Sequence, residues 1–222
     1  RALHEAADLG LTFIDTALAY GRGHSERLIG RFLVERRDRV LVATKMPPAN
    51  GRWTAQGKVA EVFPRKYVNS CAEQSLQNLG VERLDLLQLH VWSADWIHQD
   101  EWHDTLLDLQ ASGKVAHFGI SVGAHEPETA VEIARSGRID TVQVIYNIFD
   151  QSPEKELFGA CQESGVGVIA RVPFDEGALT GEITPETSFA RKDWRNRYFS
   201  GDRKQQVQDR VQQLSELLGE EV

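Results

Sequence analysis

The stretch LTFIDTALAYG (residues 11–21) begins with a short apolar run and then places Asp15 and Tyr20 a tight turn apart. A run of this length, apolar up to its last residue, is typical of a strand buried on both faces. Comparable runs recur along the chain. Six strands are predicted, over residues 11–15, 40–44, 84–89, 117–121, 141–146 and 166–171.

Segments with helical spacing lie between these strands, and glycines such as Gly80 and Gly165 mark their ends. This alternation predicts an α/β fold with a parallel sheet covered by helices. A doubly wound dinucleotide-binding domain is disfavoured because no G-x-G-x-x-G follows the first strand. The pattern instead fits a (β/α)8 barrel fragment that lacks its first strand and its last strand and helices. Residues 1–222 are predicted to form this single domain, incomplete at both ends.

Composition narrows the class of protein. The 222 residues carry a formal net charge of −8, which argues against wholesale binding to nucleic acid or to an anionic membrane. No apolar run has the length needed to cross a bilayer. Cys71 and Cys161 lie far apart, each in a helical pattern, and are interpreted as reduced thiols. Reduced cysteines indicate a cytoplasmic protein.

Three ionisable residues occupy equivalent places at the ends of consecutive predicted strands. Asp15 ends LTFID, Lys45 ends VLVATK and His90 ends LDLLQLH. In a barrel, the carboxyl ends of the strands converge on one face, where active sites are built. Because buried ionisable side chains cost free energy unless they are paired, three of them at strand ends favour a functional site that also includes Tyr20.

The chemistry of these four side chains suits the reduction of a carbonyl group. A lysine held by an aspartate stays protonated and favours the phenolate of a nearby tyrosine. Such a tyrosine can donate or accept a proton near neutral pH, and a neutral imidazole can hydrogen-bond a substrate oxygen. None of the four supplies a hydride, so a nicotinamide cofactor is implied.

Residues of these types also serve two other chemistries. Lys45 could form a Schiff base, but that role needs a neutral lysine, which Asp15 disfavours. A metal-dependent hydrolase would use histidine and carboxylate ligands. His90 is followed by Val91 and Trp92 rather than by a second ligand, so a metal site is disfavoured.

Several ordered motifs resemble the aldo-keto reductase family over nearly the whole chain. FIDTALAYGRGHSERLIGRFL is similar to its D-T-A-x-x-Y-G segment with the S-E that follows, and VLVATK to its lysine strand. SLQNLGVERLDLLQLH, SGKVAHFGIS, VQVIYN and GVGVIARVPFDEGALTG resemble its later segments. The resemblance implies a (β/α)8 barrel that reduces aldehydes and ketones with NADPH, or runs the reverse oxidation. It makes Tyr20 the general acid/base, tuned by Lys45 and Asp15, with His90 orienting the carbonyl.

The resemblance also implies cofactor contacts, with departures from the family pattern. Ser121 and Gln143 match positions that hold the nicotinamide carboxamide. Val122 stands where the family has an amide side chain, and Arg171 where it often has a stacking tyrosine, although a guanidinium can also stack on a ring. The segment resembling a pyrophosphate-covering loop contains Pro173, Gly177, Leu179 and Gly181. NADPH is the expected cofactor from the family alone, and NADH is possible.

Aromatic residues near the predicted face are candidates for a substrate pocket. Trp92 follows His90, and Trp53 lies in a long loop expected over residues 47–63. The partner is expected to be a small carbonyl compound or alcohol. The competing hypotheses are a nicotinamide-binding redox sensor without significant turnover, and a fragment that is inactive by itself. DWRNRYF (residues 193–199) is interpreted as a structured surface loop, with a contact to a cofactor phosphate or a partner as the alternative. A last helix is expected over 203–218.

Overall fold

The computed structural model describes residues 1–36, 40–123 and 125–219. The chain divides into two compact units. The first comprises Arg1–Ile145 and Ser152–Ile169, and the second comprises Tyr146–Gln151 and Ala170–Val222. Asp15, Tyr20, Lys45, His90 and the cofactor candidates Ser121 and Gln143 all lie in the first unit. The four side chains predicted to carry the chemistry therefore belong to one compact body.

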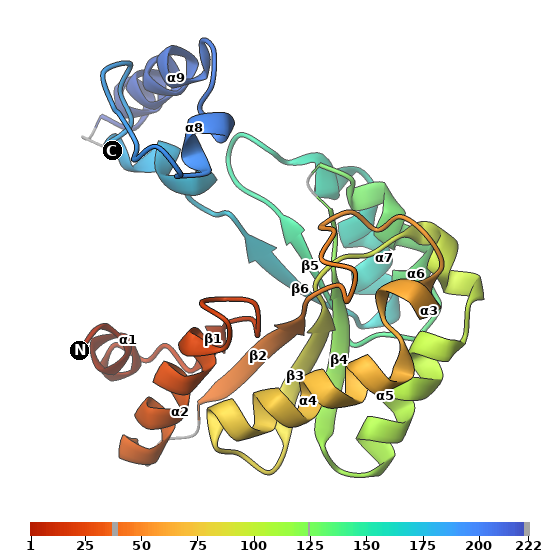
Figure 1. The fold of residues 1–222 in the computed structure, drawn as a ribbon. Coiled ribbons are helices and arrows are strands. Elements are labelled where there is room, and N and C mark those ends of the chain that lie inside the picture. The colour runs from red at the N-terminus through yellow and green to blue at the C-terminus, as the bar shows by residue number, and fades with distance from the viewer. Residues whose placement is uncertain (37–39, 124, 220–222) are drawn as a thin grey trace. The chain divides into compact units, whose positions relative to one another are not determined.

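The strands follow one another in the sheet in chain order (Figure 1). They are β1 (Phe13–Asp15), β2 (Leu41–Met46), β3 (Leu84–Leu89), β4 (Val115–Ser121), β5 (Thr141–Ile145) and β6 (Gly167–Arg171). The pairs from β1·β2 to β4·β5 are parallel. A parallel sheet in chain order, with a helical crossover between neighbouring strands, is the arrangement of successive β/α units in a barrel.

Helices of the first unit cover one face of this sheet (Figure 1). They are α2 (His24–Glu35), α4 (Arg65–Leu79), α5 (Glu101–Ala111), α6 (Val131–Arg135) and α7 (Leu157–Ser164), with α1 (Ala2–Asp8) at the start. The short turns η2 (Pro127–Ala130) and η3 (Ser152–Lys155) precede α6 and α7. Apolar side chains from both layers, such as Leu76 and Leu87, form one buried cluster. Burial of this cluster drives the packing of the helices onto the sheet.

Strand periodicity separates this apolar core from a polar face. Val42, Leu89 and Ile120 point to the helices and belong to the core. Residues one step away along each strand point to the opposite face. That face carries Asp15, Lys45, Gln88, Ser121 and Gln143, as the strand register shows: Asp15 pairs with Ala43, Lys45 with Gln88, and Ser121 with Gln143.

Short elements appear where loops were expected. The segment 47–63 contains α3 (Val59–Val62), and η1 (Ala94–His98) follows β3. DWRNRYF contains the short helix α8 (Arg195–Tyr198), and among its residues only Phe199 is buried. The predicted last helix is α9 (Arg203–Leu218).

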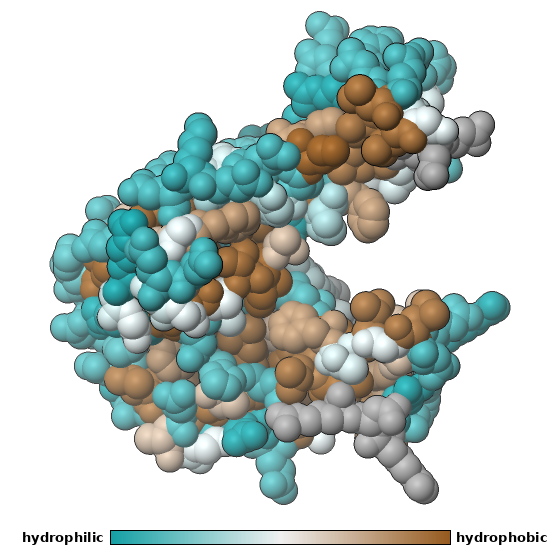
Figure 2. Space-filling model, turned by 180° about the vertical axis from the view of Figure 1, so that it is seen from behind, coloured by the Kyte–Doolittle hydropathy of each residue, from teal (hydrophilic) through white to brown (hydrophobic). Residues whose placement is uncertain are grey.

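The second unit has a small core of its own. Ala178 in η4 (Asp175–Thr180) packs with Ile183, Phe199, Val207 and Val211. Other large apolar side chains of this unit are exposed, namely Ile148, Phe174, Trp194, Leu217 and Leu218. Figure 2 shows a hydrophobic patch on this unit beside hydrophilic surface.

Within the described ranges, no helix combines the length and the apolar character needed to cross a lipid bilayer.

Candidate active site

The centre of the site is a buried ion pair between two neighbouring strands. The Lys45 Nζ lies 2.6 Å from Asp15 Oδ2 and donates a second hydrogen bond, of 2.7 Å, to the carbonyl oxygen of Thr16. Lys45 is fully buried, whereas the Asp15 side chain is 33% exposed. A fully buried ammonium needs such partners, because removing the charge from water is costly. The pair therefore holds the lysine cation at the strand ends.

Tyr20 comes to the ion pair through a tight turn after β1. The turn uses left-handed backbone conformations at Gly21, Arg22 and Gly23, which glycine adopts without steric cost. Its hydrogen bonds include Tyr20 N–H to the carbonyl of Ala17. The Lys45 Nζ lies 5.5 Å from the centre of the Tyr20 ring, which is 45% exposed. A half-exposed phenol thus sits next to a buried cation.

His90 lies beside Tyr20 at the end of β3. Its backbone N–H donates to the carbonyl of Met46, which ties the end of β3 to the end of β2. The His90 ring centre is 5.8 Å from that of Tyr20 and 4.9 Å from that of Trp53, and both contacts are edge-to-face. The three rings form a continuous row, so the sequence-predicted Asp15, Tyr20, Lys45 and His90 lie together with Trp53.

Ser121 and Gln143 lie on the same polar face, and both are buried. The Gln143 Nε2 donates a 2.9 Å hydrogen bond to Asp15 Oδ1, so this carboxylate accepts from both Lys45 and Gln143. Val122 points into the apolar core, and its N–H donates to the Gln143 carbonyl. The link between Gln143 and Asp15 was not foreseen, because no local pattern relates residues so far apart in sequence.

The remaining cofactor candidates, Arg171, Pro173, Gly177, Leu179 and Gly181, belong to the second unit, in and around η4. The N–H groups of Gly177 and Leu179 both donate to the carbonyl of Phe174. The loop has positive φ at the non-glycine residues Val172, Asp175 and Glu176. Such backbone strain persists only where surrounding contacts fix it.

Those contacts converge on the buried side chain of Asp175. It accepts hydrogen bonds from the Tyr198 hydroxyl and from Arg203 Nη2, at 3.2 Å for the latter. Burial raises the pKa of the neighbouring Glu176 carboxyl above its usual range, and Arg171 opposes this shift. The roles of the second unit's residues in cofactor binding remain predictions.

A cavity of about 410 Å³ opens next to His90. The predicted pocket residues Trp53 and Trp92 both line it, together with Thr54, Ala55, Gln56, Val91, Ser93, Gly123, Glu126 and Thr129. Trp92 is almost fully buried, and its Nε1 donates to the carbonyl of Thr129. The polar lining, including Glu126, was missed by the sequence reasoning.

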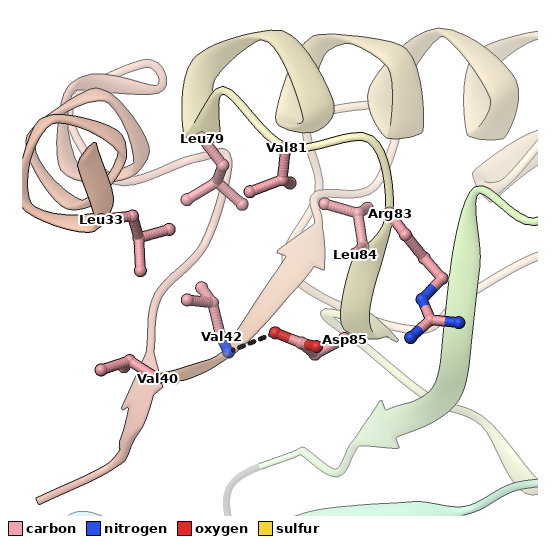
Figure 3. Close-up of a pocket in the computed structure, with 8 residues that line it drawn as sticks. All are labelled: Leu33, Val40, Val42, Leu79, Val81, Arg83, Leu84 and Asp85. Carbon is pink, nitrogen blue, oxygen red and sulfur yellow. Dashed lines mark hydrogen bonds between the residues drawn. The ribbon is translucent and has the colours of Figure 1, made fainter. Parts of the chain in front are cut away.

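A smaller, largely apolar cavity of about 190 Å³ lies at the opposite ends of β2 and β3. Leu33, Val42, Leu79 and Leu84 line it, with Asp85 beside them (Figure 3). Asp85 accepts a hydrogen bond from the Val42 N–H. This cavity contains none of the predicted site residues.

A buried carboxylate lies on the helix side of the same strands. Glu26, fully buried in α2, accepts hydrogen bonds from Thr44 Oγ1 at 2.6 Å and from Asn78 Nδ2 at 2.8 Å. Thr44 precedes Lys45, and Glu26 follows the turn that carries Tyr20. The S-E pair after Y-G was noted in the sequence, but its partners in β2 and α4 were not. Among the described residues, no three His, Cys, Asp or Glu side chains are grouped to hold a metal ion.

Comparison with known proteins gives consistent matches. The family model described as "Aldo/keto reductase family" matches residues 1–221. The chain is 32% identical over 192 residues to the L-glyceraldehyde 3-phosphate reductase of Escherichia coli strain K12, covering 81% of this chain and 54% of that protein. Curated relatives are longer, since the chain spans 62%, 64% and 59% of the length of three others that it matches.

Solved structures match in the same way. The glycerol dehydrogenase AKR11B4 from Gluconobacter oxydans has a TM-score of 0.74 and 29% identity, covering 99% of this chain and 68% of that one. An aldo-keto reductase from Klebsiella pneumoniae in complex with NADPH has a TM-score of 0.63 and 28% identity. It covers 84% of this chain and 61% of that one.

Proposed function

The chain belongs to the aldo/keto reductase family, and on that premise we propose that it carries the catalytic centre of a nicotinamide-dependent oxidoreductase. The reaction is the reduction of an aldehyde or ketone to an alcohol, or the reverse. Family membership confirms the predicted resemblance and the predicted partial (β/α)8 barrel. A single domain and a cytoplasmic location stay predictions.

The observation that carries the proposal is the buried Lys45 cation between the Asp15 carboxylate and the Tyr20 ring. The cation stabilises the phenolate form of Tyr20, so the hydroxyl gives up its proton more readily than a free phenol does. Asp15 keeps Lys45 charged by accepting its hydrogen bond. In the reduction, Tyr20 protonates the carbonyl oxygen, and in the oxidation it removes the alcohol proton.

His90 positions the carbonyl. Its ring contacts that of Tyr20 on one side and that of Trp53 on the other. A neutral imidazole in this place donates a hydrogen bond to the carbonyl oxygen and steadies the charge that develops there. Tyr20 then transfers its proton to an oxygen that is already oriented, which lowers the entropic cost of the step.

The residues of the first unit fit a nicotinamide cofactor. A carboxamide needs both donors and acceptors, and the buried Ser121 hydroxyl and Gln143 amide offer both on the face that carries Asp15 and Lys45. When bound, the nicotinamide supplies the hydride. Ser121 and Gln143 fix its carboxamide in this proposal, and Val122 contributes no side-chain donor.

Arg171 and the segment from Pro173 to Gly181, in the second unit, stay predicted cofactor-binding residues. NADPH is the expected form, with NADH as the alternative, and the Klebsiella pneumoniae structure similar to this chain contains NADPH. No described contact favours a redox sensor without turnover over an enzyme. The expected partner is a small carbonyl compound or alcohol.

The test uses the full-length protein. NADPH and then NADH are titrated into the protein, and binding is followed by fluorescence. Whichever cofactor binds is then mixed with the protein and a simple aldehyde, and its oxidation is followed by the loss of the absorbance of the reduced nicotinamide. We expect saturable binding and aldehyde-dependent consumption. A protein that binds neither cofactor would refute the proposal, and binding without consumption of cofactor by any aldehyde would favour the sensor hypothesis instead.

A further inference from the structure

The cavity next to His90 has a mixed apolar and polar lining. The rings of Trp53 and Trp92 provide flat apolar surface. Thr54, Gln56 and Ser93 provide hydroxyl and amide groups, which both donate and accept hydrogen bonds. Its volume of about 410 Å³ has room for a small polyol or sugar-sized molecule. Such walls suit a compound with C–H faces and several hydroxyl groups.

The charge on the described lining of the cavity is negative. Glu126 is the single ionisable side chain among the described residues that line the cavity, and none of them is cationic. An anionic substrate would leave water for a site without an opposite charge, which is costly for a phosphate or carboxylate. Like-charge juxtaposition with Glu126 would weaken its binding further.

Gly123 lies next to the Glu126 carboxylate at the cavity. A Cβ atom at Gly123 would lie 2.8 Å from Glu126 Oε2, so a larger residue there would displace this flexible carboxylate. Both residues line the cavity. Glu126 is exposed, so its charge is partly screened by water and salt.

We propose that this cavity binds uncharged, hydroxylated aldehydes or ketones and selects against phosphorylated or carboxylated ones, with Glu126 as a specificity-determining residue. The inference rests on the proposed function, because it places the carbonyl at His90. It separates this chain from the similar Escherichia coli protein, whose name specifies a phosphorylated substrate. Family membership alone does not predict this difference.

The test compares a matched pair of substrates, glyceraldehyde and glyceraldehyde 3-phosphate, with the full-length protein and NADPH. We expect kcat/KM to be at least tenfold higher for glyceraldehyde. In Glu126→Gln, the ratio of kcat/KM for glyceraldehyde to kcat/KM for glyceraldehyde 3-phosphate should fall about three- to tenfold, because the substitution removes the negative charge. Glu128→Gln, which alters an exposed carboxylate outside the cavity lining, is the control and should change neither value.

Salt provides a second readout. Raising the salt concentration should lower the ratio of kcat/KM for glyceraldehyde to that for glyceraldehyde 3-phosphate more in the wild type than in Glu126→Gln, because salt ions screen the carboxylate charge. Equal turnover of both aldehydes would overturn the inference, as would an unchanged ratio in Glu126→Gln. A preference for the phosphate that disappears in Arg52→Gln would also overturn it, by assigning anion binding to the exposed arginine next to Trp53.

Binding is measured separately from turnover, by the quenching of tryptophan fluorescence by each aldehyde. Selective quenching by glyceraldehyde without reduction would leave the inference standing and refute the proposed function. Reduction of both aldehydes without selectivity would refute the inference and leave the proposed function standing. A protein that neither binds nor reduces either aldehyde would refute both.

Discussion

Replacing Lys45 by methionine removes the cation on which the proposed chemistry depends. The Lys45 Nζ lies 5.5 Å from the centre of the Tyr20 ring, and a unit charge at that distance contributes about 3 kcal/mol at an effective dielectric constant of 20. The Asp15 carboxylate, 2.6 Å from Nζ, opposes part of this effect. The net effect of Lys45 is to stabilise the phenolate form of Tyr20.

The direction of the effect follows from the proton that Tyr20 supplies. Without the cation, the phenol holds its proton to higher pH. Reduction needs the protonated phenol, so the alkaline limb of the rate profile should move to higher pH. The maximal rate should also fall, because a less acidic phenol is a weaker proton donor.

The assay is aldehyde-dependent consumption of NADPH by the full-length protein over a range of pH. Lys45→Arg, which keeps the positive charge, is the matched variant. The alkaline limb of its pH–rate profile should lie closer to that of the wild type. Circular dichroism controls for folding, because Lys45 is fully buried. A Lys45→Met profile that superimposes on the wild type would refute the reasoning, whatever the maximal rate.

Two further predictions concern the first unit. Glu26→Gln should lower the free energy of unfolding by about 1–3 kcal/mol in urea, because an amide cannot accept from both Thr44 and Asn78 through its two polar atoms. Glu35→Gln in the same helix is the control and should change the free energy of unfolding by less than about 0.5 kcal/mol, since Glu35 is exposed. Equal losses in the two variants would contradict the stabilising role of the buried Glu26 carboxylate. Burial raises the pKa of the Cys71 and Cys161 thiols, so little thiolate forms at pH 8. A disulfide reagent should therefore react slowly with the native protein and rapidly after unfolding, and rapid reaction in the native state would exclude this burial.

Much of the fold follows from local pattern. The apolar run at 84–89 and the long helical pattern at 203–218 agree with β3 and α9, because the spacing of apolar residues along the sequence indicates the type of element. Strand ends also predicted which ionisable residues would gather, since parallel strands bring their carboxyl ends to one edge. Asp15, Lys45 and His90 were found in this way.

Other features depend on contacts that no local pattern reveals. The short helix α8 is held by tertiary contacts of Phe199, which stacks on Phe189 with ring centres 5.7 Å apart. Gln143 in β5 reaches Asp15 in β1, although three strands lie between these two in the sheet order, and Glu126 reaches the cavity from an irregular loop. The resemblance to the family predicted the cofactor role of Gln143, whereas its hydrogen bond to Asp15 required coordinates to be recognised.

The most direct test of the central claim, that Tyr20 transfers the proton, is the turnover of Tyr20→Phe. The aromatic ring and its contacts with His90 and Lys45 are kept, and only the hydroxyl is lost. Loss of general acid catalysis predicts a fall in kcat of about 10²–10⁴-fold, with NADPH affinity nearly unchanged. Tyr67→Phe in α4, a tyrosine outside the site, should keep full activity. A Tyr20→Phe enzyme that turns over at the wild-type rate would contradict the account.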